Sequence, residues 1–458
     1  MNLIIIPGHP LSGEIGDGAL YPLPGDKSLS HRAALLAALA EGVSVIENFL
    51  VSGVTRAMLN ALTDLGVSWE LNGNALQVQG KGLRGLRSPE RPINCGNSAT
   101  TIRLLAGALA ASGVHAVLDG SAGLRARPMG RIVEPLQAMG VPITASAGDC
   151  APLTLANRPV DNLLRALDYT LPVASAQVKS CLLLAALAAN GTMILREPGP
   201  SRDHTERMLR SMGIQISGKR PNEPGNLSAP SGSLYETRIS PTQPVRLAPL
   251  QLCLPGDLSA AAFLIVAAVI TPGSRLEIKG VGLNPARTGL LEALRSMGAD
   301  IRESSIGERG GEPVGDLMVV SSPLHGTQIR GDLVVRMIDE FPAFAVAAAY
   351  ADGLTQVSEA GELRHKESDR ITALCAELHQ IGVRVSETPD GFSVEGGWPL
   401  RGGAIQPHGD HRLAMSLAVA GLAAREPVIV QNAEIMNESF PDFAATLQSL
   451  GASLKVEA

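Results

Sequence analysis

A segment recurs six times along this chain of 458 residues, and the repetition limits the possible folds more than any other feature. Each copy contains an amphipathic run, a glycine and a short apolar run, as in "LTDLGVSW" and "LRSMGIQI". A glycine that follows an amphipathic run is typical of the left-handed cap that ends a helix. We predict six repeats that pack together, because one repeat alone could not bury its apolar faces. The six glycines are Gly66, Gly140, Gly213, Gly298, Gly382 and Gly451.

Each repeat is predicted to contain two helices and two strands. Upstream of each glycine, a small polar cluster opens an Ala- and Leu-rich run, which is typical of the start of a buried helix. In the first repeat we expect helices over 33–40 and 54–65, and strands over 43–46 and 67–71. The sequence therefore indicates an α/β fold.

The repeats divide into two groups of three. Residues 219–249 are rich in Pro, Ser and Gly, and we expect them to connect the two groups. The string "LPGD" opens repeats one and four, at residues 23–26 and 254–257. We predict two similar lobes, with the active site in the cleft between them. One lobe comprises residues 24–252, and the other comprises residues 1–23 plus 253–458.

The composition excludes several classes of protein. Hydrophobic residues make up 45% of the chain and charged residues 18%, which describes a packed globular protein. A net charge of -6 argues against a nucleic-acid partner. The apolar run at 260–270 is shorter than the roughly 20 residues needed to span a membrane. The N-terminal apolar run is too short for a signal peptide. We expect a cytoplasmic protein without a membrane partner.

The cysteines and histidines give no sign of a metal. The five cysteines are widely spaced and form no C-x-x-C pair, so neither a zinc ribbon nor a disulfide framework is indicated. We find no spacing of His, Asp and Glu that is typical of a metal site. The expected metal content is therefore none.

Basic residues gather near the polar clusters that open the buried helices. Helix N-termini add unpaired N–H groups there, which together with the cations suit phosphate and carboxylate groups. The sequence therefore predicts a small polyanionic substrate. Thirteen of the 38 basic residues belong to this set: Lys27, Arg32, Arg103, Arg125, Arg127, Arg131, Lys179, Arg202, Arg336, Arg364, Lys366, Arg370 and Arg412.

Structural roles compete with each of these interpretations. A single Lys or Arg near a helix start is usually a solvated or salt-bridged side chain. The string "GDKS" resembles the end of a nucleotide P-loop, but Asp26 interrupts the required Gly-Lys step. His31 and His411 are candidates for structural histidines, and Asp26 and Asp257 are expected to cap helices. The recurrence of the cations at equivalent points of the repeat favours a functional role for the set.

Eight strings occur in the order of a known family. They are "LPGDKSLSHR", "GNSATTIR", "RPMGR", "VASAQVKS", "SRDHTERM", "MIDEFP", "LRHKESDR" and "HGDHRLAMS". Together they resemble the 5-enolpyruvylshikimate-3-phosphate (EPSP) synthase family, in particular its class II bacterial members. The resemblance implies a two-lobed inverted α/β barrel, the enolpyruvyl transferase fold, with three repeats per lobe. It also implies a monomer without a cofactor that works in the shikimate pathway, which leads to chorismate and the aromatic amino acids.

The implied reaction transfers the enolpyruvyl group of phosphoenolpyruvate to the 5-hydroxyl of shikimate 3-phosphate and releases phosphate. It proceeds by addition and elimination through a tetrahedral intermediate. We expect Asp339 to act as base toward the 5-hydroxyl, and Glu367 with Lys27 to transfer the proton at C3, with His411 as a further candidate. The resemblance implies phosphoenolpyruvate binding by Lys27, Asn97, Ala99, Arg127, Gln177, Arg370 and Arg412. It implies shikimate 3-phosphate binding by Lys27, Ser28, Arg32, Ser175, Ala176, Gln177, Arg202, Asp339 and Lys366.

Two positions depart from the pattern of some members. Glu438 in "NESFPDF" stands where some members use a lysine on phosphoenolpyruvate, and we expect Arg370 and Arg412 to suffice in its place. Ala99 in "GNSAT" stands where glyphosate-sensitive members have glycine. Its methyl group should crowd the longer inhibitor more than the substrate, so we expect glyphosate tolerance.

Two other functions fit parts of the sequence less well. The UDP-N-acetylglucosamine enolpyruvyl transferases share the fold and the donor, but they usually carry a cysteine just before "ARPMG", where this chain reads "GSAGLR". They also have Lys-Asn where this chain has Lys27 and Ser28. A repeat scaffold that has lost its activity would lack the charges at the helix starts, and this chain retains them.

Overall fold

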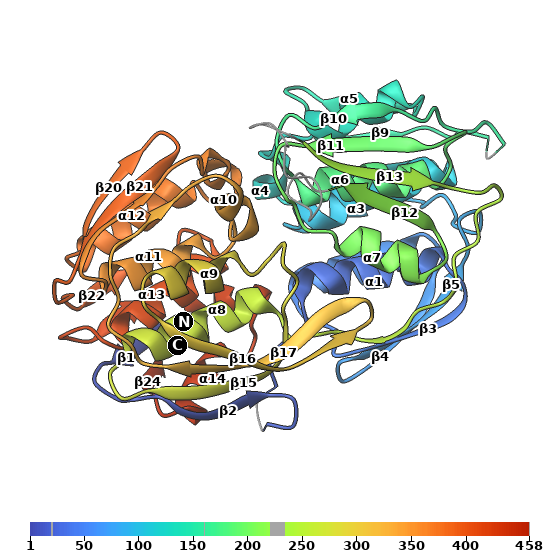
Figure 1. The fold of residues 1–458 in the computed structure, drawn as a ribbon. Coiled ribbons are helices and arrows are strands. Elements are labelled where there is room, and N and C mark those ends of the chain that lie inside the picture. The colour runs from blue at the N-terminus through green and yellow to red at the C-terminus, as the bar shows by residue number, and fades with distance from the viewer. Residues whose placement is uncertain (20–21, 160, 220–233, 458) are drawn as a thin grey trace. The chain divides into compact units, whose positions relative to one another are not determined.

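The computed structural model describes residues 1–19, 22–159, 161–219 and 234–457, which form two compact lobes (Figure 1). The first lobe consists of residues 27–254 and 309–312. The second lobe consists of residues 1–26, 255–308 and 313–458. These boundaries lie within three residues of the chain positions expected from the sequence, except that the short segment 309–312 belongs to the first lobe.

The first lobe contains three repeats, each with one buried helix, at least one outer helix and one four-stranded sheet. Its sheets have the strand orders β14-β3-β5-β4, β6-β7-β9-β8 and β10-β11-β13-β12. The first repeat is α1 (Lys27–Leu39), β3 (Glu41–Glu47), α2 (Gly53–Asp64), β4 (Ser68–Asn72) and β5 (Ala75–Lys81). The second is β6 (Ile93–Asn94), α3 (Ala99–Ser112), β7 (Ala116–Asp119), α4 (Ala122–Arg125), α5 (Gly130–Ala138), β8 (Ile143–Ser146) and β9 (Cys150–Leu155). The third is β10 (Asp168–Thr170), α6 (Ala176–Ala186), β11 (Met193–Glu197), α7 (His204–Ser211), β12 (Gln215–Lys219), β13 (Tyr235–Ser240) and then β14 (Gln251–Cys253).

The second lobe repeats this plan three more times and includes the N-terminal strands. Its sheets have the orders β16-β17-β15-β2, β18-β19-β21-β20 and β22-β23-β1-β24. The elements up to the fourth repeat are β1 (Asn2–Ile6), β2 (Ser12–Gly16), α8 (Leu258–Ile270), β15 (Arg275–Gly282), α9 (Gly289–Ser296), β16 (Asp300–Arg309) and β17 (Glu312–Val320). The fifth repeat is β18 (Gln328–Ile329), α10 (Asp332–Arg336), α11 (Phe341–Ala349), β19 (Gly353–Val357), η1 (Gly361–His365), α12 (Arg370–Gln380), β20 (Arg384–Thr388) and β21 (Gly391–Gly396). The sixth is β22 (Gly403–Ile405), α13 (His411–Gly421), β23 (Val428–Val430), η2 (Ala433–Glu438), α14 (Phe443–Ser449) and β24 (Ser453–Glu457).

The six glycines end helices as predicted. Each has a positive φ, between 84° at Gly66 and 105° at Gly451, which is the left-handed backbone that favours glycine. In every case the outer helix stops there and a strand follows. The prediction of six repeats, three in each group, is confirmed.

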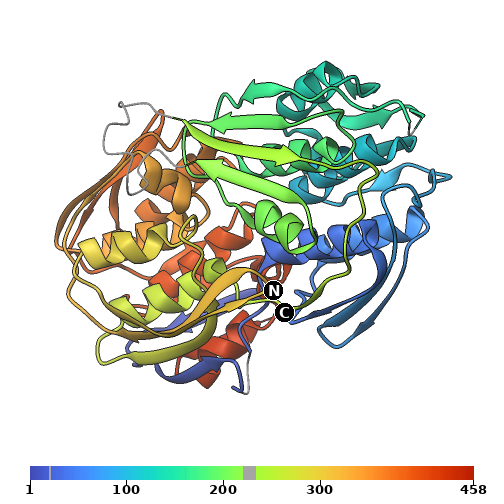
Figure 2. The ribbon, with the colours of Figure 1, turned by 45° about the vertical axis from the view of Figure 1, so that its right-hand side comes forward.

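The helix at the start of each repeat is buried because its residues are apolar nearly all round. All thirteen residues of α8 are buried, and so are the residues of α1 from Leu29 to Leu39. In the first lobe, α3 packs directly on α6 (Figures 1 and 2). Gly107 permits this approach, because a Cβ there would collide with the carbonyl of Cys181. Each lobe therefore has a core of central helices covered by its own sheets.

The sequence patterns predicted two strands per repeat, whereas each sheet has four. The prediction ended the first repeat at 67–71, whereas β5 follows β4 and pairs antiparallel with both β3 and β4. In the third repeat the corresponding strand is β13, which pairs with β11 and β12. The interpretation of residues 219–249 as a simple connection is therefore wrong at β13, and residues 220–233 lie outside the described part.

The N-terminal strand completes the last sheet. β1 lies between β23 and β24 and is antiparallel to both, in the place that β5 takes in the first repeat. Within the described residues, no helix is long and apolar enough to cross a membrane.

Candidate active site

The first turn of α1 presents Lys27 and Ser28 and is supported by Arg32 one turn later. Arg32 is only 4% exposed. Its guanidinium donates to the carbonyl oxygen of Ser28 at 3.0 Å, to Thr205 Oγ1 at 2.8 Å and to Ser180 Oγ at 2.9 Å. Burial lowers the pKa of Arg32 to about 10, so the side chain is still charged at neutral pH. The contacts with α6 and α7 fix a cation at the start of α1.

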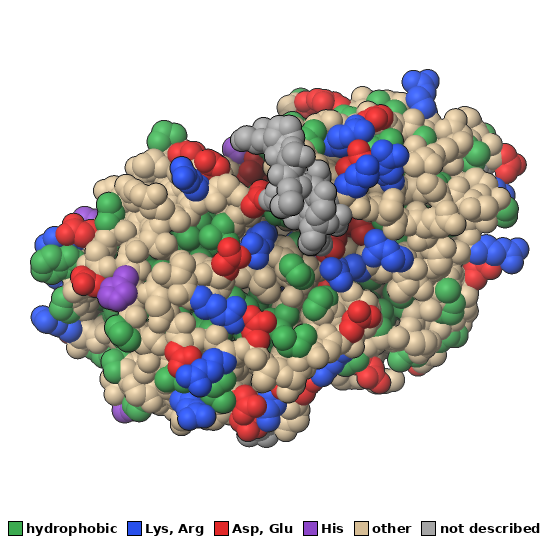
Figure 3. Space-filling model, in the orientation of Figure 1, with side chains coloured by type: hydrophobic (Ala, Val, Ile, Leu, Met, Phe, Trp, Pro, Cys, Tyr) green, Lys and Arg blue, Asp and Glu red, His purple; other side chains and the backbone are tan. Residues whose placement is uncertain are grey.

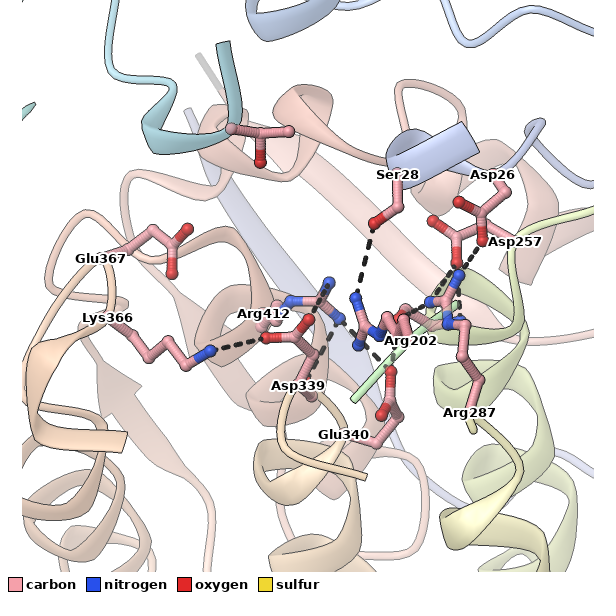
Figure 4. A network of polar contacts seen from close by, with 12 residues as sticks. Asp26, Ser28, Arg202, Asp257, Arg287, Asp339, Glu340, Lys366, Glu367 and Arg412 are labelled. Carbon is pink, nitrogen blue, oxygen red and sulfur yellow. Dashed lines mark hydrogen bonds and ion pairs between the residues drawn. The ribbon is translucent and has the colours of Figure 1, made fainter. Parts of the chain in front are cut away.

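Arg202 joins the same group from the segment before α7. Its Nη1 lies 3.4 Å from the hydroxyl oxygen of Ser28 (Figure 4). The structure therefore brings together three of the residues predicted to bind a phosphate-bearing substrate, namely Ser28, Arg32 and Arg202. Hydroxyl and guanidinium donors in one group are suited to phosphate oxygens.

The starts of α3 and α6 carry the other predicted residues of the first lobe. Ser98 caps α3, and Ala99 is the first residue of this helix and is buried. Asn97, just before the cap, accepts a hydrogen bond from the Ser121 hydroxyl at 3.0 Å. Ser175 caps α6, and its hydroxyl lies 3.4 Å from the backbone nitrogen of Val178. The polar clusters read from the sequence thus lie at helix N-termini.

Gln177, the second residue of α6, is held by α3. Its Nε2 donates to Thr100 Oγ1 at 2.9 Å, and its Oε1 accepts a hydrogen bond from Arg103. Arg103 also donates to the carbonyl oxygen of Pro128 at 3.1 Å, next to Arg127 in the chain. Arg103 therefore links α6 to the segment that carries Arg127.

In the second lobe, three cations lie close to the carboxylate of Asp339, and Figure 4 shows two of them, Lys366 and Arg412. Asp339 Oδ1 lies 3.4 Å from both Lys366 Nζ and Arg370 Nη1. Arg412 Nη2 lies 3.8 Å from Asp339 Oδ2, and Arg412 Nη1 donates to the Asp339 carbonyl oxygen at 3.2 Å. A carboxylate in this setting is held in one orientation, which is a property that a general base requires.

Arg370 connects the other carboxylates of this site. It is 1% exposed, and its Nη2 lies 2.6 Å from Glu367 Oε2 while its Nε lies 2.7 Å from Asp410 Oδ2. Burial by itself would lower the pKa of Arg370, but the carboxylates, with Asp410 first, raise it above the usual range. Arg370 is therefore a permanent cation that fixes the position of the Glu367 carboxylate.

The start of α13 carries His411 and Arg412. Asp410 caps this helix and accepts from the backbone nitrogen of Arg412 at 2.9 Å. His411 is buried, and its Nδ1 lies 3.6 Å from Glu438 Oε2. Glu438, which stands where some family members have lysine, therefore faces His411.

Within the described part of the chain, four further cations of the gathered set pair with carboxylates that are not among the predicted site residues. Lys179 is buried between Glu197 Oε1 at 2.6 Å and Glu206 Oε1 at 2.9 Å. Arg125 pairs with Asp119, Arg336 with Glu292 and Arg364 with Asp369. These four cations therefore have structural roles, although the sequence analysis placed them among the candidate substrate-binding cations.

Sequence reasoning missed the residues that hold the site cations in place. Thr205 and Ser180 support Arg32, and Asp410 supports Arg370. Thr205 stands in the "SRDHTERM" string and Asp410 in the "HGDHRLAMS" string, so the signal was present. Their partners lie far away in the chain, which is why the strings alone do not show their roles.

Over the described residues, no group of three or more His, Cys, Asp and Glu side chains is arranged to hold a metal ion. The described cysteines are thiols and are not joined in disulfides. On the face drawn in Figure 3, basic and acidic side chains lie interspersed. The gathering of cations seen at the helix starts is therefore not repeated on this face.

The chain is similar to known proteins in both sequence and structure. The family model for EPSP synthase (3-phosphoshikimate 1-carboxyvinyltransferase) matches residues 8–447. The curated 3-phosphoshikimate 1-carboxyvinyltransferase of Synechococcus sp. (strain JA-3-3Ab) is 45% identical over 451 residues, covering 98% of this chain and 96% of the relative. That of Geobacter sulfurreducens is 44% identical over 445 residues, covering 97% of this chain and 98% of the relative.

Solved structures agree with these matches. An EPSP synthase from Acinetobacter baumannii has a TM-score of 0.84 and 37% identity, with all of both chains covered. The enolpyruvyl transferase NikO from Streptomyces tendae has a TM-score of 0.77 at 20% identity, covering 99% of this chain and 98% of the other. The second likeness shows the fold alone, and the two together confirm the predicted enolpyruvyl transferase fold.

Proposed function

This chain belongs to the EPSP synthase (3-phosphoshikimate 1-carboxyvinyltransferase) family, and on that premise we propose which of its side chains carry the reaction. The chain is an enzyme of the shikimate pathway. It transfers the enolpyruvyl group of phosphoenolpyruvate to the 5-hydroxyl of shikimate 3-phosphate and releases phosphate. The roles assigned to individual residues are our proposal.

The chemistry defines what the side chains must do. The 5-hydroxyl oxygen attacks C2 of phosphoenolpyruvate while C3 takes up a proton, which gives a tetrahedral intermediate. Loss of a proton from C3 and departure of phosphate from C2 then restore the double bond. The enzyme must therefore hold two anionic substrates, remove the proton of the hydroxyl, and give and take back one proton at C3.

Phosphoenolpyruvate is assigned to Lys27, Arg127, Arg370 and Arg412, with Asn97, Ala99 and Gln177 around it. Guanidinium groups bind carboxylates and phosphates through two parallel hydrogen bonds, which orients the substrate as well as attracting it. The fixed guanidinium of Arg370 supports this assignment, because it is held on one side by Asp410 at 2.7 Å. The contact of Arg370 with Asp339 is longer, at 3.4 Å. A substrate anion can take the place of Asp339 there with little rearrangement.

Shikimate 3-phosphate is assigned to Lys27, Ser28, Arg32, Arg202, Ser175, Ala176, Gln177, Asp339 and Lys366. The grouping of Ser28 with Arg32 and Arg202 in the first lobe supports the phosphate end of this assignment. Ser28, Arg32 and Arg202 belong to the first lobe, and Asp339 and Lys366 belong to the second.

The observation that carries the catalytic assignment is the Asp339 carboxylate among Lys366, Arg370 and Arg412. When these cations turn to the substrate anions, a lone pair of Asp339 becomes available to the 5-hydroxyl proton. Glu367, fixed by Arg370 at 2.6 Å, acts with Lys27 in the proton transfer at C3, and His411 is the further candidate for this step.

The remaining proposals concern inhibition, assembly and location. We propose that Ala99 gives glyphosate tolerance, because its methyl group is fixed at the first residue of a buried helix and cannot move aside. We also propose that the chain is a cytoplasmic monomer without a cofactor, which is what its resemblance to the EPSP synthase family implies. Sedimentation of the purified chain tests the monomer directly.

The experiment that tests the proposed function measures phosphate release from phosphoenolpyruvate. Shikimate 3-phosphate and UDP-N-acetylglucosamine are supplied separately as acceptors. Release with shikimate 3-phosphate alone supports the assignment, and loss of that release in Asp339→Asn supports the general base. Release with UDP-N-acetylglucosamine alone, or with neither acceptor, overturns it.

A further inference from the structure

The "SRDHTERM" string contains buried polar side chains besides the proposed substrate cation Arg202. His204 and Thr205 are each 1% exposed, and Glu206 is 4% exposed. Thr205 and Glu206 bind cations of the first lobe, whereas His204, the first residue of α7, binds a carboxylate. A buried histidine two residues after a substrate cation can control where that cation lies.

The partner of His204 lies at the tip of the β16–β17 hairpin. Nδ1 of His204 lies 2.7 Å from Oε1 of Glu312, which is the first residue of β17 and is 2% exposed. Residues 309–312 belong to the first lobe, whereas the residues on both sides of them belong to the second. The tip of this hairpin is therefore part of the first lobe and is bound to the start of α7.

A second contact binds the hairpin tip to α7. Arg207 Nη1 donates to the carbonyl oxygen of Gly311 at 2.9 Å, and Arg207 Nε donates to Asp203 Oδ1 at 2.9 Å. Gly310 and Gly311 have φ values of 56° and 81°, which permit the two-residue turn at the tip. Asp203 directly follows Arg202 in the chain. The tip is thus connected to the residues next to Arg202 by two independent contacts.

The contact between His204 and Glu312 needs a hydrogen-bond acceptor at position 312. Among the described residues, Nε2 of His204 has no hydrogen-bond partner. An imidazolium would bury an N–H group there without an acceptor, which is unfavourable, so we assign a neutral ring with its proton on Nδ1. Glutamate and glutamine both offer an acceptor oxygen to this proton, whereas alanine does not.

We propose that Glu312 is a positioning residue for shikimate 3-phosphate, which acts by fixing the start of α7 and thereby the place of Arg202 beside Ser28. This inference rests on the proposed role of Arg202 as a ligand of that substrate. Arg202 stands two residues before His204, and its Nη1 lies 3.4 Å from the hydroxyl oxygen of Ser28. When His204 loses its acceptor, its buried N–H must find another, and the segment that carries Arg202 shifts with it. A small displacement of a binding group weakens its contact with the substrate.

The two substrates should respond differently to such a shift. The cations assigned to phosphoenolpyruvate come from α1, α12, α13 and the segment before α5. Arg202 comes from the segment before α7 and is assigned to shikimate 3-phosphate alone. Displacement of the start of α7 should therefore raise the KM for shikimate 3-phosphate more than the KM for phosphoenolpyruvate.

The test compares two substitutions at position 312 of the full chain. Glu312→Ala removes the acceptor, whereas Glu312→Gln keeps an acceptor oxygen and removes only the charge. For each variant we measure kcat, the KM for each substrate and the Tm. Burial lowers the pKa of Arg32, and Glu206 and Glu312 oppose this effect. The glutamine variant therefore separates positioning by Glu312 from an effect of its charge on Arg32.

We expect Glu312→Ala to raise the KM for shikimate 3-phosphate by at least about fivefold, and to change the KM for phosphoenolpyruvate by less than about twofold and kcat by less than about threefold. Glu312→Gln should raise the KM for shikimate 3-phosphate by less than about twofold. Equal KM values for shikimate 3-phosphate in the two variants would overturn the inference, and so would an equal rise in both KM values in Glu312→Ala.

Arg158→Met is the control for lost stability in the same lobe. Arg158 is also buried, at 6% exposed, and it donates to carbonyl oxygens, among them those of Ala110 and Ala111 at the end of α3. The substitution should lower the Tm without raising the KM for shikimate 3-phosphate. A selective rise in that KM in Arg158→Met would count against the inference, because it would show that lost stability alone has this effect.

A second variant serves if Glu312→Ala does not fold. Arg207→Met removes the other contact with the hairpin tip, and Arg207 is 19% exposed, so this substitution leaves no fully buried charge unpaired at position 207. It should raise the KM for shikimate 3-phosphate by at least about threefold and leave the KM for phosphoenolpyruvate within about twofold. Unchanged KM values for both substrates in Arg207→Met would overturn the inference.

Arg202→Met distinguishes failure of the inference from failure of the proposed function. This variant should raise the KM for shikimate 3-phosphate by more than Glu312→Ala does, because it removes the ligand itself. An unchanged KM for shikimate 3-phosphate in Arg202→Met would overturn the proposed role of Arg202 together with the inference. A raised KM in Arg202→Met with an unchanged KM in Glu312→Ala would overturn the inference alone.

Discussion

Nε2 of His31 lies 3.3 Å from the hydroxyl oxygen of Ser98, and Nδ1 of the same ring lies 2.8 Å from the carbonyl oxygen of Lys27. A carbonyl oxygen only accepts, so Nδ1 carries the proton and Nε2 accepts from Ser98. Ser98 caps α3 directly before Ala99. A neutral His31 therefore joins the first turn of α1 to the first turn of α3.

The first prediction concerns pH and stability at His31. Burial lowers its pKa to about 4 in the folded chain, against about 6.5 when unfolded. The unfolded chain therefore binds more protons than the folded chain between these values, and the free energy of unfolding falls as the pH falls from about 6.5 to about 4. The loss from this site is on the order of 2–3 kcal/mol. Urea titrations of the wild type and His31→Gln at several pH values measure it.

The variant should show a shallower loss of stability across this window, because it has no group at 31 to protonate. His408, which is partly exposed and pairs with Glu377, provides the control as His408→Gln. Identical slopes in the wild type and His31→Gln would contradict the assignment of a neutral buried His31.

The second prediction concerns Glu367. Glu367→Gln removes the charge that pairs with Arg370 at 2.6 Å and removes a proton carrier at C3. We expect kcat to fall by about 10²- to 10⁴-fold, with a smaller change in the KM for shikimate 3-phosphate. Asp369→Asn is the control, since Asp369 pairs with Arg364 at 2.8 Å and is two residues away in the chain. An equal fall in kcat in the two variants would argue against a specific role for Glu367.

The third prediction concerns glyphosate. Ala99→Gly removes one methyl group at the first residue of α3, where the helix is capped by Ser98 and the loss of helix propensity matters least. The inhibition constant for glyphosate should fall by at least about tenfold, while the KM for phosphoenolpyruvate should change by less than about threefold. Ala57→Gly in α2, a similarly buried residue, should leave the inhibition constant unchanged. An inhibition constant in Ala99→Gly no lower than that of the wild type would refute the steric explanation.

The parts of the fold that depend only on residues close together in the chain could be predicted from the sequence. The glycine caps and the buried helices are local, so the periodicity indicated them and the structure confirmed them. β5 and β13 were missed, although every second residue of β5 is buried, as in a typical half-buried strand. Both pair with strands elsewhere in their sheets, and those partners are not visible in the local sequence. Asp257 was expected to cap a helix and does so, but nothing near it in the sequence pointed to its ion pair with Arg287 at 2.9 Å.

In the candidate active site, too, local features could be predicted from the sequence and tertiary contacts could not. Polar clusters at the helix starts were recognised because a helix N-terminus has a local signature. Which carboxylate neutralises which cation depends on tertiary contacts. Lys179 is the clearest case, since its two partners, Glu197 and Glu206, gave no signal from the sequence.

The fourth prediction concerns the burial of Lys179. Lys179 and both its partners are at most 6% exposed, so Lys179→Met leaves two buried carboxylates without their cation. We expect the free energy of unfolding to fall by about 3–5 kcal/mol. Arg196→Met removes a more exposed cation that pairs with Asp168 and should lower it by less than about 1 kcal/mol. A similar small effect of both substitutions in urea titrations would show that the Lys179 cluster is dispensable for stability.

The fifth prediction concerns Glu438. Because Glu438 faces His411 at 3.6 Å, a lysine in its place would add a second cation beside His411 and not simply a new ligand for phosphoenolpyruvate. Arg370 and Arg412 remain in place in such a variant. We therefore expect Glu438→Lys to lower the KM for phosphoenolpyruvate by less than about tenfold. Glu434→Lys, in the same short helix and exposed, controls for added positive charge. A fall in KM much larger than tenfold in Glu438→Lys alone would mean that Glu438 weakens substrate binding in this chain.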